Sequence, residues 1–309
     1  MILCCGEALI DMIPKPTNTG AMGFVPHDGG ASLNTSVALG RLGVQVGLLS
    51  GVSTDIFGQQ ITASLNASHV NASHLIRSDR PTTLAFVQLT NGSAAYTFMD
   101  ENSAGRMIAT SDLPEISDEV NAALFGGISL CLEPAAATYQ TLQAKLAKKH
   151  VVMLDPNIRP KSIGDVVVYR NRLEAMIGLS DIVKVSDEDL NWLYPGSESL
   201  TSKLQKIRSA GPVVVILTRG GDGASAFLSD GTEVHAGIEK VKVVDTVGAG
   251  DTFNAGFLAK LSEMGLLSKD ALRSTSGEDI QTALKFAAKV AAVTVSRAGA
   301  NPPWRHELT

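Results

Sequence analysis

Short, uninterrupted apolar runs recur along the chain, and each ends in a small, polar or acidic residue. Examples are "ILCC", "VGLLS", "VVMLD", "DIVKVS" and "VVVILT". Such runs are typical of parallel strands that are covered on both faces. Between them lie segments with apolar residues at helical spacing, such as "PAAATYQTLQAKLAKKH" and "DIQTALKFAAKVAAVTVSR". The alternation predicts an α/β fold with a mainly parallel central sheet and helices on both of its faces.

Two segments, at about 11–28 and 82–106, break this alternation. They begin "DMIPKPTNTG" and "TTLAFVQLTNG" and read as extended, turn-rich chain, the second as a hairpin about Asn91-Gly92. Neither contains a helical pattern with which to form its own core, and no internal repeat or low-complexity linker divides the chain. We therefore expect one domain over residues 1–309, from which the two segments project as a small β-sheet lid.

Composition narrows the classes of partner. The 309 residues are 44% hydrophobic and 18% charged, as expected of a globular protein. The net charge is −5 and no basic run is present, which argues against nucleic acid and membrane partners and favours small molecules. Cys4, Cys5 and Cys131 have neither metal-ligand spacing nor an even count, and "MILCCGEALIDMIP" lacks the features of a signal peptide. We expect a cytoplasmic location.

One stretch, "VVDTVGAGDTFNAGFLAKL", places three small residues and a carboxylate at the start of an apolar helical pattern. Gly248, Ala249 and Gly250 precede Asp251, and the pattern stops at Gly265. The N–H groups of a first helical turn attract anions, and a carboxylate beside a bound phosphate can accept a proton from an incoming hydroxyl. The spacing alone leaves open that Asp251 only caps the helix.

Two common phosphate-binding patterns do not account for this stretch. A dinucleotide fingerprint needs Gly or Ala where Phe253 stands, and no G-x-x-x-x-G-K-[ST] loop occurs. If this stretch binds phosphate, its motif is therefore of another type.

The chain resembles the PfkB, or ribokinase-like, carbohydrate kinase family. "DTVGAGDTFNAG" (residues 245–256) and "GGASLNTSVALGRLG" (residues 29–43) are similar to its two signatures. Further matches, "GEALIDMIP", "DENSAGRM", "DPNIRP", "LTRGGDG" and "SRAGANPP", cover essentially the whole chain. Within the family, "DPNIR" with "DENSAGRM" is most similar to bacterial fructokinases, with 2-keto-3-deoxygluconate kinases close behind. The resemblance implies a Rossmann-like αβα sandwich with a small β lid over the sugar.

The resemblance also implies roles for individual residues. Asp251 corresponds to the general base, and the N–H groups of Gly248, Ala249 and Gly250 correspond to an anion hole. The sugar-binding positions are Asp11, Gly29, Gly30 and Asn34, with Arg106 and Arg159 as weaker candidates for contact with substrate or phosphate. The alternatives without a role in binding are that Asp11 is a solvated turn residue and that the two arginines are solvated surface charges.

ATP is the cofactor that the resemblance implies. Thr218 and Gly220 end a predicted strand where α/β sheets hold ligands, and Gly250 adjoins the phosphates. Mg²⁺ would be carried by the phosphates and water. Where ribokinases have N-x-x-E, "KVSDEDLNWL" offers Ser186 with Glu188 or Asp189. Asp245 and the Val247 carbonyl match the K⁺ loop of some family members.

We expect from this an ATP-dependent sugar kinase that converts fructose to fructose 6-phosphate. The alternatives are 2-keto-3-deoxygluconate kinase, which needs Arg159 or Arg106 to face a carboxylate, another PfkB sugar or nucleoside kinase, and a catalytically silent sensor of sugar or nucleotide. Sugar and ATP are the expected partners, together with a homodimer formed through the lid.

Overall fold

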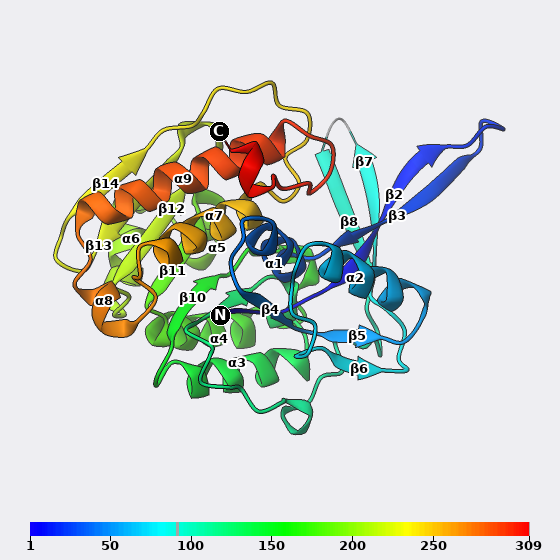
Figure 1. The fold of residues 1–309 in the computed structure, drawn as a ribbon, viewed down its shortest axis with the longest axis horizontal. Helices are drawn as coiled ribbons and strands as arrows, with labels where there is room; N and C mark the ends of the chain where they lie inside the picture. The colour runs from blue at the N-terminus through cyan, green and yellow to red at the C-terminus, as the bar shows by residue number, and fades with distance from the viewer. Residues whose placement is uncertain (91–92, 309) are drawn as a thin grey trace.

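A computed structural model describes residues 1–90 and 93–308. Its largest sheet has eight strands in the order β14-β13-β12-β11-β10-β9-β1-β4 (Figure 1). These are β1 (Ile2–Cys5), β4 (Val46–Leu49), β9 (Ala122–Gly126), β10 (Val151–Asp155), β11 (Ile182–Ser186), β12 (Val214–Thr218), β13 (Ala224–Leu228) and β14 (Glu233–Ala236). Neighbouring strands in the series β4, β1, β9, β10, β11 and β12 pair in parallel, and β13 and β14 continue the sheet antiparallel. The five apolar runs are β1, β4, β10, β11 and β12, so the prediction of a mainly parallel sheet is confirmed.

Helices cover both faces of this sheet, because alternate residues of each buried strand point to opposite sides. One core joins Cys4, Met153 and Ile182 to helices on the first face, and the other joins Cys5, Leu154 and Val183 to helices on the second. The helices of the first face are α1 (Ala31–Arg41), α2 (Ile56–Ala67), α7 (Ala249–Glu263), α8 (Lys269–Arg273) and α9 (Gly277–Val295). Those of the second face are α3 (Ala135–Leu146), α4 (Val166–Leu179), α5 (Asp187–Leu193) and α6 (Leu200–Ser209). Within the described residues, no helix is both long and apolar enough to cross a bilayer.

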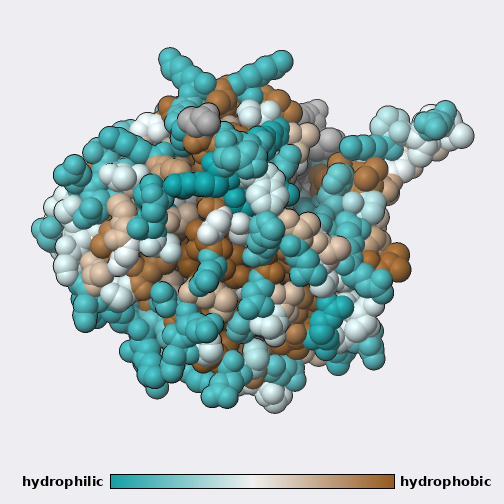
Figure 2. All heavy atoms as spheres, viewed as in Figure 1, coloured by the Kyte–Doolittle hydropathy of each residue, from teal (hydrophilic) through white to brown (hydrophobic). Residues whose placement is uncertain are grey.

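The two segments that break the strand-helix alternation supply a separate four-stranded sheet in the order β3-β2-β7-β8. Its strands are β2 (Leu9–Pro16), β3 (Met22–Gly29), β7 (Leu84–Thr90) and β8 (Ser93–Met99), and a third sheet pairs β5 (Gly51–Ser53) with β6 (Ile76–Ser78). The predicted turn at Asn91-Gly92 lies outside the described residues, although its flanking strands pair antiparallel. The β2–β3 hairpin projects from the sandwich as an arm whose tip is polar and whose root is apolar (Figures 1 and 2).

The edge of the main sheet at which the parallel strands end brings the predicted site residues together. β10 ends at Asp155 and β12 at Thr218, while α1 begins at Ala31 and α7 at Ala249. In open α/β sheets, ligands bind at this edge because loops and helix N-termini surround it. The small sheet lies over the same edge, since Asp11 of β2 and Tyr96 of β8 line a cavity with the first turn of α7.

Candidate active site

Two cavities meet at the first turn of α7. One, of about 700 Å³, is lined by the small sheet, the loop after β10 and the α7 turn. The other, of about 630 Å³, is lined by the end of β12, the loop before α7 and one side of α9. Thr246, Ala249 and Gly250 line both. After the ligands that the family resemblance implies, we call the first the sugar cavity and the second the nucleotide cavity. A group passing from one to the other would cross this turn.

The α7 turn has a backbone that suits an anion. Gly248 is the N-cap residue in the left-handed region, at φ 77°, and a Cβ there would lie 2.7 Å from the Ala300 Cβ. Glycine is therefore needed both for its conformation and for its size. The N–H of Ala249 donates to the Thr246 carbonyl (3.2 Å), whereas Gly250 and Asp251 stand where a helix provides no intrahelical acceptor. These two N–H groups are the better candidates for binding phosphate.

Asp251 is the third residue of α7 and does not cap it, because the N-cap is Gly248 and no side chain makes a capping hydrogen bond there. Instead, Asn34 of α1 donates to Asp251 Oδ2 (2.9 Å), and the Thr35 hydroxyl donates to the Asp251 carbonyl (3.1 Å). Burial raises the pKa of Asp251 from 3.8 to about 6, although the Asn34 hydrogen bond opposes the shift. The carboxylate is thus ionised at neutral pH yet more basic than usual, as a general base requires.

Asp11 lies on β2 and lines the sugar cavity together with Asp251. Burial, and then the charge of Asp251, raise the pKa of Asp11 to about 7. Gly29 does not line the cavity, but a Cβ on it would lie 2.2 Å from Asp11 Oδ2, so this glycine makes room for the carboxylate. Gly30 lines the cavity at φ 102° and packs against the Glu7 backbone.

The two candidate arginines differ in position. Arg159 lines the sugar cavity, and its Nη1 donates to the carbonyls of Asn157 (3.3 Å) and Ile158 (3.1 Å). Arg106 does not line it. Its Nε donates to the Glu133 carbonyl (3.2 Å), and its Nη1 lies 3.5 Å from Asp100. The structure therefore places one guanidinium at the site and the other outside it.

Thr218, Gly220 and Gly250, to which the resemblance assigns ATP binding, line the nucleotide cavity. Its wall on α9 is formed by small and aliphatic side chains, namely Ala288, Ala291, Ala292 and Val295. An apolar wall of this kind suits a nucleotide base, while the nearby α7 turn suits phosphate.

The carboxylates of the predicted metal residues differ in the hydrogen bonds that they accept. Asp189 accepts the N–H groups of Ile158 (2.9 Å) and Ser186 (3.2 Å), one with each oxygen. Asp245 likewise accepts those of Val247 (3.0 Å) and Gly299 (2.9 Å). Glu188 lines the sugar cavity. In the part of the chain that the structure describes, no three His, Cys, Asp or Glu side chains are grouped as for a metal ion.

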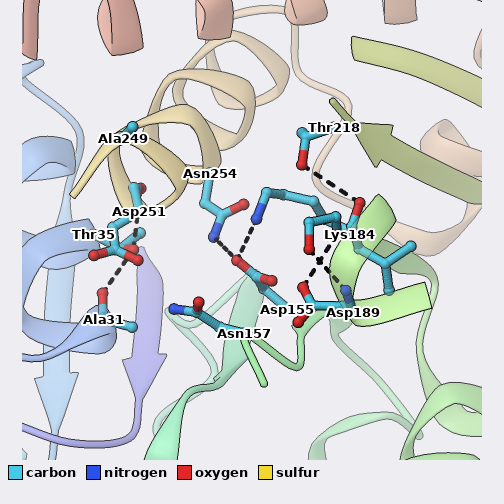
Figure 3. A network of polar contacts seen from close by, with 12 residues as sticks. Ala31, Thr35, Asp155, Asn157, Lys184, Asp189, Thr218, Ala249, Asp251 and Asn254 are labelled. Carbon is cyan, nitrogen blue, oxygen red and sulfur yellow. Dashed lines mark hydrogen bonds and ion pairs between the residues drawn. The ribbon is translucent and has the colours of Figure 1, made fainter. Parts of the chain in front are cut away.

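Several side chains near the site were not identified from the sequence. Tyr96 and Phe98, stacked 6.0 Å apart on β8, line the sugar cavity. Glu7 does so too, and its carboxylate accepts the N–H groups of Ala31 (3.0 Å) and Ser129 (3.2 Å). Further in, Lys184 and Asp155 form a buried ion pair below α7 (Figure 3). The sequence signals for that pair are a lysine within the apolar run of β11 and an aspartate at the end of the apolar run of β10.

Comparison with known proteins agrees with this geometry. A sequence model of the "pfkB family carbohydrate kinase" group matches residues 1–307, so the chain belongs to that family. A fructokinase from Rhizobium leguminosarum bv. trifolii is 46% identical over 276 residues, which cover 89% of this chain and 83% of the relative.

Solved structures agree as well. A fructokinase from Xylella fastidiosa with bound ATP has a TM-score of 0.91 at 26% identity, covering 99% of this chain and 97% of that one. A fructokinase double mutant from Vibrio cholerae O395, in a form with fructose, ADP and potassium ion, has a TM-score of 0.84 at 26% identity, covering 97% and 93%. The expected ribokinase-like fold, with its small separate sheet, is confirmed.

Proposed function

We propose that this pfkB-family carbohydrate kinase is an ATP-dependent fructokinase that transfers the γ-phosphoryl group of ATP to the primary hydroxyl of fructose. The observation that carries the proposal is the meeting of the two cavities at the α7 turn, where the buried Asp251 carboxylate stands. The fructokinase relatives of this chain support fructose as the sugar.

In this proposal the residues of the chain perform three tasks. Asp11 accepts hydroxyl hydrogens of the sugar and holds it in the sugar cavity. Asp251 takes the proton of the attacking sugar hydroxyl. At the same time, the hydroxyl oxygen bonds to the γ-phosphorus, and the bond from that phosphorus to the leaving ADP oxygen breaks. The N–H groups of Gly250 and Asp251 stabilise the charge on the transferred group. Closure of the small sheet over the sugar would exclude water and limit ATP hydrolysis.

Metal ions would assist at the nucleotide end. Mg²⁺ bound with ATP would neutralise phosphate charge, and of the predicted metal residues Glu188, which lines the sugar cavity, would contact its water shell. A monovalent ion would use Asp245 and the Val247 carbonyl, since each Asp245 oxygen accepts one backbone N–H group and keeps a lone pair for a cation.

The charge of the sugar cavity favours a neutral sugar over a sugar acid. Among the described residues that line it, four are carboxylates and one is an arginine, Arg159. The acids are Glu7, Asp11, Glu188 and Asp251. A substrate carboxylate would meet more repulsion than attraction there, and Arg106 lies outside the cavity. This disfavours 2-keto-3-deoxygluconate, and the intact α7 turn with Asp251 disfavours a silent sensor.

ADP release over a panel of fructose, ribose, 2-keto-3-deoxygluconate, aminoimidazole riboside and adenosine tests the proposal. We expect fructose to give the highest kcat/KM. A higher value for 2-keto-3-deoxygluconate would refute the fructokinase assignment and give Arg159 a carboxylate-binding role.

A homodimer through the small sheet and a cytoplasmic location complete the proposal. The sheet exposes apolar side chains, with Met22 65% and Met99 59% exposed, which contact with a second copy would cover. Sedimentation of the protein at micromolar concentration should give twice the monomer mass, and a monomer at all concentrations would exclude the dimer.

A further inference from the structure

A lysine and an aspartate interrupt two apolar strands directly below the α7 turn. Lys184 lies on β11, two residues after Ile182, and Asp155 ends β10, two residues after Met153. Ile182 and Met153 are register partners within the core of the first sheet face, so the two polar side chains point to that same face, toward α7. Both are buried, at 6% and 5% side-chain exposure. Desolvation makes even a paired buried charge costly, so this pair is better explained by a function than by stability.

The contacts of the pair lead to α7. Lys184 Nζ lies 2.6 Å from Asp155 Oδ2, and the same oxygen accepts a hydrogen bond from Asn254 Nδ2 at 2.7 Å (Figure 3). Asn254 is in the first turns of α7, three residues after Asp251, and is 2% exposed. Lys184 Nζ also lies 3.5 Å from where a Cβ on Gly250 would stand. The ammonium is thus packed against the turn at which the two cavities meet.

We propose that Lys184 and Asp155 are positioning residues for phosphoryl transfer: through Asn254 they hold the start of α7 in place, and their paired charges act on the Asp251 carboxylate. Neither side chain is among those that line the sugar cavity or the nucleotide cavity, so they act through α7. The inference rests on the proposed function, in which Asp251 is the base.

The charges around Asp251 indicate the direction of each effect. Asp155 raises the pKa of Asp251, whereas Lys184 and Arg159 lower it, and Asp11 faces it across the sugar cavity. Removing Lys184 alone leaves the charge of Asp155 uncompensated, which raises the pKa of Asp251. Replacing both members of the pair removes one charge that raises the pKa of Asp251 and one that lowers it.

The test compares Lys184→Met, Asp155→Asn and the double variant with wild type. Met retains the length of the lysine stem, and Asn at 155 can still accept from Asn254. Lys203→Met is the matched control, because Lys203 is also a buried lysine, 2% exposed, but its Nζ binds Asn191 and the Gly196 carbonyl, and it lines neither cavity. Two quantities are measured: the midpoint of the Asp251 carboxyl titration by ¹³C NMR, and kcat with sugar and ATP saturating.

We expect Lys184→Met to raise the titration midpoint of Asp251 above the wild-type value by about one pH unit. Its kcat should fall by about 10- to 100-fold with the sugar KM changed less than about threefold. The double variant should have a midpoint at or below the wild-type value and recover part of the lost kcat, because its neutral pair still holds Asn254. Lys203→Met should match wild type in both measurements.

Equal Asp251 midpoints in wild type and Lys184→Met would overturn the inference, and so would an equal loss of kcat in Lys203→Met. If Lys184→Met does not fold, Asp155→Asn provides the test with the opposite sign, since its Asp251 midpoint should fall. The titration needs no turnover. A wild-type protein that phosphorylates no sugar would refute the proposed function, while the midpoints would still decide the charge coupling.

Discussion

Replacing Asp251 by Asn should abolish most activity while making the protein more stable at neutral pH. Asn keeps the shape and can still accept from Asn34, but it cannot take a proton from a hydroxyl. We expect kcat to fall by about 10²- to 10⁴-fold, as for the loss of a general base. Sugar affinity should stay near wild type.

The gain in stability follows from the burial of the charge. Asp251 is 7% exposed, and its pKa rises from 3.8 to about 6 on folding. A shift of that size corresponds to a cost of about 3 kcal/mol for holding the carboxylate ionised in the folded protein. Because the folded state binds the proton more tightly than the unfolded chain, the cost is absent below about pH 4, grows as pH rises and is fully present above about pH 6. The Asn variant carries no charge at this position and does not incur this cost.

Two assays check these values. Coupled measurement of ADP release gives kcat, and urea unfolding at pH 4 and pH 8 gives the free energy of unfolding. The Asn variant should exceed wild type by up to about 3 kcal/mol at pH 8 and by much less at pH 4. Asp165→Asn is the control, since Asp165 is a true N-cap that accepts the N–H groups of Val167 and Val168, and Asn caps equally well.

Turnover above about a tenth of the wild-type rate in a folded, saturated Asp251→Asn protein would refute the base assignment, since losses for a general base are usually at least 10²-fold. Equal free energies of unfolding for variant and wild type at pH 8 would show that burial of the Asp251 charge does not destabilise the fold.

Four further predictions follow from the site. Asp11→Asn should raise the sugar KM by about 10- to 100-fold without changing the KM for ATP, because it removes charge-assisted hydrogen bonds, and steady-state kinetics with each substrate varied would show this. In wild type, kcat/KM for the sugar should fall as pH decreases through 7 to 6, where Asp11 and Asp251 take up protons, and a flat profile from pH 8 to 5 would contradict it. Gly248→Ala should lower the free energy of unfolding by about 1 to 3 kcal/mol, measured in urea, because of its φ of 77° and the nearby Ala300. Ala291→Phe should fill the nucleotide cavity and raise the KM for ATP by about tenfold or more while leaving the sugar KM unchanged, and equal changes in both would indicate a general loss of structure.

Features of the fold that depend on local pattern could be read from the sequence. The five apolar strands, the helices between them and the glycine turn before α7 each depend on residues close together in the chain. β9, "AALFG", was not identified, since a short run rich in alanine carries little strand signal. The antiparallel edge formed by β13 and β14 also escaped, because strand direction in a sheet depends on pairing and not on the apolar run itself.

For the site, too, the sequence determined some features and the tertiary structure determined others. The sequence by itself determined that Asp251 follows a glycine-rich helix start, but it left open whether this carboxylate caps the helix or faces a substrate. The tertiary structure excludes the cap, because Gly248 is the N-cap residue, and it places Asn34, 217 positions away, 2.9 Å from the Asp251 carboxylate. It also turned Arg106 toward Glu133, engaged Asp189 with backbone N–H groups, and joined Lys184 to Asp155 beneath α7. These outcomes depend on which polar groups meet across separate elements, because a buried polar group must find its partner wherever the fold brings one within reach.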